Sequence, residues 1–160
     1  MTPNSAVNSV LREHQSCCIT GSYEENRCGL DVRGLEHSNL IALHGTNYQS
    51  NHSWQGRLCD RIIMGRLNEN FVCAVEFKGG RSADIATAIE QIQGGLNLAV
   101  ALRLGAWAAE WHPILVYSGS VPRDELNVLQ RRHVTYRNQR RLVRRIDCGS
   151  RLLDHLNKPQ

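Results

Sequence analysis

A nine-residue run, residues 70–78, places two charged side chains in an otherwise apolar segment. It reads Asn-Phe-Val-Cys-Ala-Val-Glu-Phe-Lys, which predicts a strand buried on both faces and hence a sheet that is covered on both sides. Because side chains alternate along a strand, Glu76 and Lys78 share one face with Val72 and Ala74. An unpaired buried charge is very costly. The Glu-x-Lys pair therefore needs either a partner or a chemical role.

A second acidic residue, Asp60, lies in another strand-like run, residues 57–64. Polar turn residues at 65–70 separate the two runs and predict a hairpin centred on Asn68. In that register positions 60 and 76 face each other, with Cβ atoms roughly 4.5–5.5 Å apart. A bulge or a longer turn would shift the pairing by one residue.

Two carboxylates at that separation repel each other unless one takes up a proton or a cation lies between them. Hard oxygen ligands favour Mg²⁺ or Mn²⁺ over zinc. The Asp60–Glu76 pair therefore predicts a divalent-cation site. The alternative is an exposed hairpin end, where Asp60 pairs with Arg57 or Arg61.

The segment after Lys78 predicts a tight turn and then a helix over residues 83–104, capped by Ser82 or Asp84. Apolar residues recur at helical spacing along it, with Gln91 and Gln93 in its middle. The pair at 94–95 is Gly-Gly, which weakens a helix by roughly 1–2 kcal/mol. It indicates a kink or a close approach of another backbone.

This arrangement of an aspartate, a Glu-x-Lys and a helix with a glutamine resembles the PD-(D/E)XK nuclease superfamily. Holliday-junction resolvases and many repair and defence nucleases share its restriction-endonuclease-like fold. The resemblance covers residues 57–97 and extends, through the predicted elements, over about 38–148. Cys59 stands where a proline often precedes the aspartate. The implied fold is α/β, with a mixed central sheet of about four to five strands and helices on both faces.

The resemblance also implies a Mg²⁺-dependent endonuclease, a hydrolase that cuts phosphodiester bonds, with DNA preferred as substrate. Asp60, Glu76 and the carbonyl of Phe77 would bind Mg²⁺ or Mn²⁺, and Lys78 would position or deprotonate the attacking water or brace the phosphate. Gln91 is preferred to Gln93 as the supporting glutamine. Such nucleases often add an acidic residue, for which the candidates are Glu13, Glu25 and Glu36.

Positive charge gathers toward the end of the chain. The whole sequence carries a net charge of +4. Residues 123–151 contain nine arginines against three acidic residues, which is +6 and leaves about −2 elsewhere. Arginine binds phosphate bidentately, so this segment favours nucleic acid as a partner, unless its arginines only solvate an amphipathic hairpin. The expected nucleic-acid contacts are Arg57, Arg81, Arg131, Arg132, Arg140, Arg141 and Arg144.

The remaining pattern predicts one domain of 160 residues. The run at 113–117 is expected to be a strand that follows a crossover and therefore lies parallel to residues 70–78. Residues 45–55 are expected to form a polar loop. The other expected elements are helices at 4–15, 123–130 and 149–156, a strand at 39–44, and a hairpin of 133–137 with 140–147.

Six cysteines without Cys-x-x-Cys spacing favour a cytoplasmic chain with reduced thiols, and neither a secretory signal nor a membrane span is expected. A zinc site would need His14, Cys17 or Cys18, Cys28 and His37, whose spacing fits no common structural site.

The resemblance and these patterns leave three functions to consider. The first is the nuclease, acting as a homodimer or as a subunit of a larger complex, in restriction, repair, recombination or antiviral defence. The second is an inactive nuclease-fold subunit that binds nucleic acid or scaffolds a complex. The third is a zinc-stabilised interaction protein.

Overall fold

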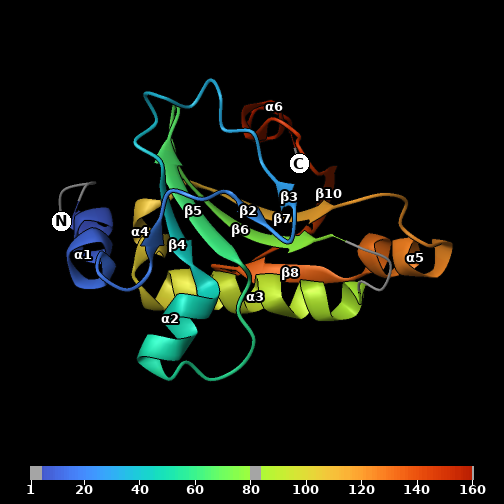
Figure 1. Ribbon diagram of the computed structural model, residues 1–160, viewed down its shortest axis with the longest axis horizontal. Coiled ribbons are helices and arrows are strands. Elements are labelled where there is room, and N and C mark those ends of the chain that lie inside the picture. Colours follow the sequence, from blue (N-terminus) through green and yellow to red (C-terminus); the bar gives the residue numbers. More distant parts are fainter. Residues whose placement is uncertain (1–4, 80–83, 160) are drawn as a thin grey trace.

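The core of the molecule is a mixed six-stranded sheet, seen in a computed structural model that describes residues 5–79 and 84–159 (Figure 1). The strand order is β1-β4-β5-β6-β7-β10. The predicted α/β class with a mixed central sheet is therefore confirmed, although the sheet has six strands rather than four or five. Its strands are β1 (Ile19–Thr20), β4 (Ile41–His44), β5 (Arg61–Arg66), β6 (Asn70–Lys78), β7 (Glu110–Tyr117) and β10 (Arg144–Asp147).

The pairing of β5 with β6 follows the predicted register. Arg66 pairs with Asn70 and Arg61 pairs with Val75, so the hairpin is centred on Asn68. From β1 to β6 the neighbouring strands are antiparallel, whereas β6, β7 and β10 run parallel. The change of direction occurs at β7 because a helix connects β6 to β7 across one face of the sheet.

That helix, α3 (Ile85–Ala101), packs its apolar stripe on the sheet face of Val72 and Ala74. Asp84 caps it by accepting a hydrogen bond from the Thr87 amide, while Ser82 lies outside the described residues. Smaller helices continue this layer: α1 (Ser5–His14), α2 (Gly45–His52) and α4 (Leu104–Trp107). The hairpin of β8 (His133–Tyr136) and β9 (Gln139–Leu142) also lies against α3, after α5 (Arg123–Arg131).

The opposite face of the sheet packs against a second apolar cluster. Phe71, Cys73, Val75 and Phe77 point into it, because they alternate with the residues that face α3. The short strands β2 (Glu24–Glu25) and β3 (Cys28–Gly29), the following loop and α6 (Leu152–Leu156) cover it. Strand β6 is therefore buried on both faces, as predicted.

Two expectations about local structure were wrong. Residues 45–52 form α2 instead of a loop, capped by the His44 side chain, which accepts a hydrogen bond from the Asn47 amide. The expected second strand of the final hairpin breaks at Val143: β9 stays with β8, but β10 moves to the main sheet and pairs with β7. Both differences come from contacts between distant segments.

The cysteines also differ from the expected reduced state. Disulfides join Cys17 to Cys18 and Cys28 to Cys148. The second bond ties β3 to the chain just after β10. Cys59 and Cys73 are free and buried. None of the helices in the described part of the chain is long and apolar enough to cross a lipid bilayer.

Candidate functional site

Asp60 and Glu76 meet where β5 begins and β6 nears its end. The backbone amide of Asp60 donates a hydrogen bond to Oε2 of Glu76 at 3.1 Å. Asp60 directly precedes Arg61, whose strand partner is Val75, so positions 60 and 76 face each other as the predicted register requires. Glu76 is 1% exposed. The alternative of an exposed hairpin end is therefore wrong.

The pairing of β5 with β6 ends at Arg61 and Val75, and beyond it the Asp60 carboxylate takes the place of a backbone partner for Phe77. Its Oδ2 accepts a hydrogen bond from the Phe77 amide at 2.8 Å. Among the described residues, no donor reaches its Oδ1. The amide and carbonyl of one strand residue point the same way, so the Phe77 carbonyl also faces the Asp60 side. Two carboxylates and a carbonyl thus converge at one edge of β6.

Lys78 and Gln91 complete this group from the α3 side. The Lys78 ammonium lies 2.6 Å from Glu76 Oε1 and donates a hydrogen bond to Gln91 Oε1 at 3.0 Å. Gln91 in turn donates from Nε2 to the Leu58 carbonyl at 3.4 Å. Gln93 instead exchanges two hydrogen bonds with the Thr135 backbone of β8. The structure thus brings Gln91, the preferred glutamine, to the Glu-x-Lys pair.

Burial and mutual repulsion disfavour ionisation of both carboxyl groups. Desolvation, followed by repulsion from Asp60, raises the pKa of Glu76 to about 7, although Lys78 opposes the shift. Desolvation also raises the pKa of Asp60, against the opposing hydrogen bond from the Phe77 amide. An acidic pair of this kind would be relieved by a divalent cation, because the cation favours both charged forms.

Two glycines of α3 let the segment before Asp60 approach the helix closely. A Cβ at Gly94 would lie 1.8 Å from the Arg57 carbonyl oxygen, and one at Gly95 would lie 2.2 Å from the Cys59 sulfur. Non-bonded contacts of a Cβ atom are essentially never that short. The Gly-Gly pair is thus explained by close approach of another backbone, which is one of its two expected causes.

The sequence analysis considered Arg61 only as an exposed partner of Asp60 and missed its burial beside the site. Arg61 is 2% exposed, and its guanidinium lies 3.1 Å from Glu25 Oε2. It also donates to the carbonyls of Ser22, Glu24 and Asp60. The local signal was that Arg61 opens an apolar run and shares a strand face with Ile63, but its partner Glu25 comes from a distant segment.

The three candidates for a further acidic residue differ in their position relative to the carboxylate pair and in their hydrogen-bond or ion-pair partners. Glu25 lies near the carboxylate pair, since it helps to raise the pKa of Asp60, yet it is already paired with Arg61. Glu13, on α1, accepts a hydrogen bond from Ser9. Glu36 accepts one from the Gly34 amide on the other side of the sheet.

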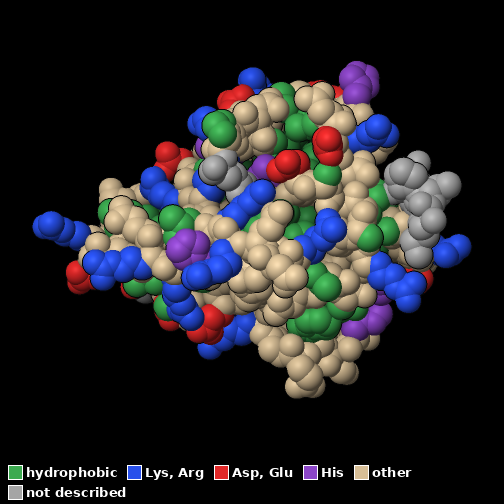
Figure 2. Space-filling view, turned by 180° about the vertical axis from the view of Figure 1, so that it is seen from behind, with side chains coloured by type: hydrophobic (Ala, Val, Ile, Leu, Met, Phe, Trp, Pro, Cys, Tyr) green, Lys and Arg blue, Asp and Glu red, His purple; other side chains and the backbone are tan. Residues whose placement is uncertain are grey.

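The seven arginines expected to contact nucleic acid fall into three groups. Arg81 lies outside the described residues. Arg57, Arg131, Arg132 and Arg140 are exposed, and Arg57 and Arg132 flank Glu90 of α3 at 3.6 and 3.5 Å. Viewed from behind, Lys and Arg side chains spread over the surface as far as the protruding end that carries α5 (Figure 2).

The last two arginines make contacts within the chain. Arg141 lies over the Trp111 ring at 4.5 Å and donates to the Trp111 carbonyl. Arg144 donates to the carbonyl of His155 and to that of Pro159. Both are therefore engaged in packing the C-terminal elements.

The set of residues expected for zinc is not brought together. Cys28 is bonded to Cys148 and points into the cluster on the far face of the sheet. His14 instead lies beside Cys17, Cys18 and His52. His52 was missed because the sequence places it 34 residues after Cys18, with no spacing signal between them.

Comparison of the chain with models of protein families, with curated proteins and with solved structures found no match.

Proposed function

We propose that the protein is a metal-dependent nuclease that hydrolyses phosphodiester bonds in nucleic acid, with DNA as the preferred substrate. The observation that carries this proposal is the convergence of Asp60 and Glu76 from neighbouring strands, with Lys78 beside Glu76 and Gln91 beside Lys78. An acidic pair, an ammonium and a glutamine in this order along the chain are the groups that the resemblance to PD-(D/E)XK nucleases implies.

The order of the elements supports the proposal. Helix α1 precedes the antiparallel strands β4, β5 and β6, and α3 then leads to the parallel strand β7. These elements fit the mixed sheet flanked by helices that the resemblance implies, with α2 inserted between β4 and β5. Asp60 directly precedes β5, Glu76 lies in β6 and Gln91 lies in α3. Strands β1 and β10 extend that sheet at its two edges.

The donor set suits a hard cation. Asp60, Glu76 and the Phe77 carbonyl offer only oxygen atoms, which Mg²⁺ and Mn²⁺ prefer. A bound ion of this type lowers the pKa of its water and neutralises charge that builds up on a phosphate. The hydrogen bonds from the Asp60 and Phe77 amides orient the two carboxylates before any ion binds.

Lys78 is suited to act on the attacking water or on the phosphate. Glu76 and Gln91 hold its ammonium in place. Its side chain is 23% exposed, so it remains accessible to solvent. Gln91 fixes the direction of that ammonium and links it to the backbone at Leu58, two residues before Asp60. A polar contact of this kind contributes to catalysis by holding the catalytic group in the right orientation.

The exposed arginines provide the affinity for the substrate backbone in this proposal. Arg57 and Arg132 are the first choice, because they flank α3 close to the segment that carries Asp60. Guanidinium groups bind phosphate bidentately and make the affinity for nucleic acid dependent on salt.

One observation favours the alternative of an inactive subunit that binds nucleic acid or scaffolds a larger complex. Most polar groups of the site already have a partner: Lys78 pairs with Glu76, and the Phe77 amide pairs with Oδ2 of Asp60. Such a network can persist for structural reasons alone. Failure of the purified chain to bind Mg²⁺ or Mn²⁺ at millimolar concentration would select this alternative.

The experiment for the nuclease is cleavage of plasmid, linear, branched and single-stranded substrates with and without Mg²⁺. The sequence offers a matched pair of variants, since its only lysines are Lys78 and the exposed Lys158. We expect Lys78→Ala to abolish Mg²⁺-dependent cleavage and Lys158→Ala to cleave like the wild type, with both variants folded by circular dichroism. Equal cleavage by the two variants would contradict the proposal.

A further inference from the structure

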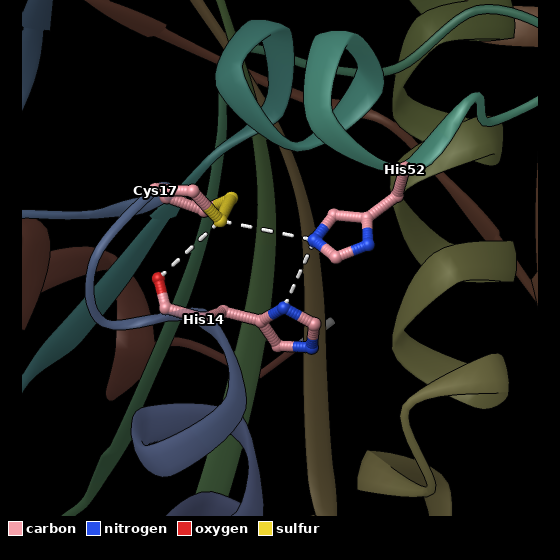
Figure 3. Close-up of side chains that lie close together, drawn as sticks. His14, Cys17 and His52 are labelled. Carbon is pink, nitrogen blue, oxygen red and sulfur yellow. Dashed lines mark hydrogen bonds between the residues drawn. A yellow bond between two sulfur atoms is a disulfide. The ribbon is translucent and has the colours of Figure 1, made fainter.

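Four metal-binding side chains gather at the N-terminal end of the molecule, outside the site described above. They are His14, Cys17, Cys18 and His52, whose ligand atoms all lie within 4.8 Å of one another. His14 ends α1, the cysteines follow in the turn before β1, and His52 ends α2 (Figure 3). The chain thus brings one ligand to the cluster from a separate part of the fold.

The distances within this cluster resemble those around a tetrahedral zinc ion. Nδ1 of His14 lies 3.2 Å from Nε2 of His52, and Sγ of Cys17 lies 3.7 Å from the same Nε2. Zinc–nitrogen bonds of about 2.05 Å and zinc–sulfur bonds of about 2.3 Å give tetrahedral edges of roughly 3.3 Å for N···N and 3.6 Å for N···S. These two edges match the tetrahedral values, whereas the two sulfur atoms are bonded to each other and must separate on reduction.

The surroundings hold the two histidines in this orientation. The Tyr48 ring stacks on His52 at 4.4 Å and meets the edge of His14 at 5.2 Å. His14 and Cys18 are buried, Cys17 is partly exposed and His52 is exposed. Metal can therefore enter from solvent at His52, while the other ligands are backed by the apolar core.

We propose that His14, Cys17, Cys18 and His52 form a structural Zn²⁺ site when the two cysteines are reduced. Two sulfur and two nitrogen ligands in a tetrahedral arrangement are typical of zinc, and hard cations such as Mg²⁺ avoid them. The Cys17–Cys18 disulfide is then the metal-free, oxidised form of the same site.

The two forms are related by a balanced exchange with a dithiol reductant. Dithiothreitol gives two electrons and two protons to the Cys17–Cys18 bond and becomes a cyclic disulfide, which leaves two thiols on the chain. Binding of Zn²⁺ then displaces one proton from each thiol, because the thiolate is the ligand.

Such an ion would join α1 to the C-terminal end of α2. The next residues, 53–60, lead from α2 to Asp60, so the zinc site would fix the start of the segment that carries the acidic pair. The zinc site does not depend on the proposed nuclease function, because it uses other residues and another class of metal.

The test is metal analysis of the full chain after reduction with dithiothreitol, exposure to Zn²⁺ and removal of unbound metal under nitrogen. We expect about one zinc per chain for the wild type. His52→Ala and Cys17→Ser should lose the zinc, whereas His37→Ala, which removes an exposed histidine outside the cluster, should keep it. The Asp60→Asn variant should also keep it, which excludes binding at the acidic pair.

A second readout reports the ligands directly. Co²⁺ in the same site should give sulfur-to-metal charge-transfer absorption and the visible bands of a tetrahedral ion, and both should disappear in Cys17→Ser. Less than about a tenth of an equivalent of zinc on the reduced wild type, or full zinc on His52→Ala, would overturn the proposal. Because His52 is exposed, that variant should keep the circular dichroism of the wild type.

Discussion

The backbone amide of Asp60 donates a hydrogen bond to Oε2 of Glu76 at 3.1 Å, across the start of the β5–β6 hairpin. The side chain of Asp60 completes the link from the other direction, through the Phe77 amide. These two bonds hold a pair of buried carboxyl groups at one edge of β6. Their mutual repulsion and burial make the pair the feature whose chemistry is most sensitive to pH and to cations.

Stability without divalent cations should fall as the pH rises through 7. The pKa of Glu76 is raised on folding from 4.5 to about 7, so the folded chain holds this proton more tightly than the unfolded chain does. The folded state has this advantage in full below about pH 4.5 and loses it as the pH rises through about 7, with a loss on the order of 1 kcal/mol between pH 6 and pH 8. Urea unfolding with a chelator should show this loss in the wild type and not in Glu76→Gln. Equal pH dependence of the two proteins would contradict it.

Gly94→Ala should destabilise the protein although alanine is a better helix former. In an open helix the change would stabilise by roughly 1 kcal/mol. Here the new Cβ would meet the Arg57 carbonyl oxygen at 1.8 Å, so the segment before Asp60 must move. We expect a loss of roughly 2 kcal/mol or more in the free energy of unfolding. Val100→Ala, at a half-exposed position of the same helix, is the control and should change it little.

Arg61→Ala should cost much more stability than Arg57→Ala. Removing Arg61 takes its donor from the Ser22 carbonyl and the nearest cation from Glu25, which is 33% exposed, while the Asp60 carbonyl keeps the Gly45 amide. We expect a cost of roughly 2 kcal/mol or more, because a buried guanidinium and its acceptors lose their pairing. Arg57 forms an exposed pair with Glu90, which is worth about 1 kcal/mol or less. Chemical denaturation of the two variants compares them, and similar losses would contradict the role given to Arg61.

The sequence alone predicted the centre of the molecule well, because its signals there are local. The turn residues around Asn68 set the register of β5 and β6, and the helical spacing after Lys78 predicted α3 and hence a parallel β7. These features in turn placed Asp60 opposite Glu76 and Gln91 near Lys78. Turn residues and side-chain periodicity were sufficient for the strands and the helix, whereas the preference for Gln91 came from the resemblance to PD-(D/E)XK nucleases.

The periphery was harder because its structure depends on distant partners. Helix α2 has little amphipathic pattern, and apart from its first residue, Gly45, only Tyr48 of its residues is buried. Strand β10 is chosen by pairing with β7, and no local feature distinguishes that outcome from a longer hairpin. His52 and Glu25 reach His14 and Arg61 only through the tertiary fold.

Calorimetric titration with Mg²⁺ tests the central claim most directly, since Mg²⁺ avoids the sulfur and nitrogen ligands of the zinc site. The wild type and Glu13→Gln, which changes an exposed carboxylate on α1, should bind Mg²⁺ at millimolar concentration. Asp60→Asn and Glu76→Gln should each weaken binding by roughly tenfold or more, because each removes one charged ligand. Undiminished binding by both variants, or no binding by the wild type, would contradict the claim that Asp60 and Glu76 hold a common cation.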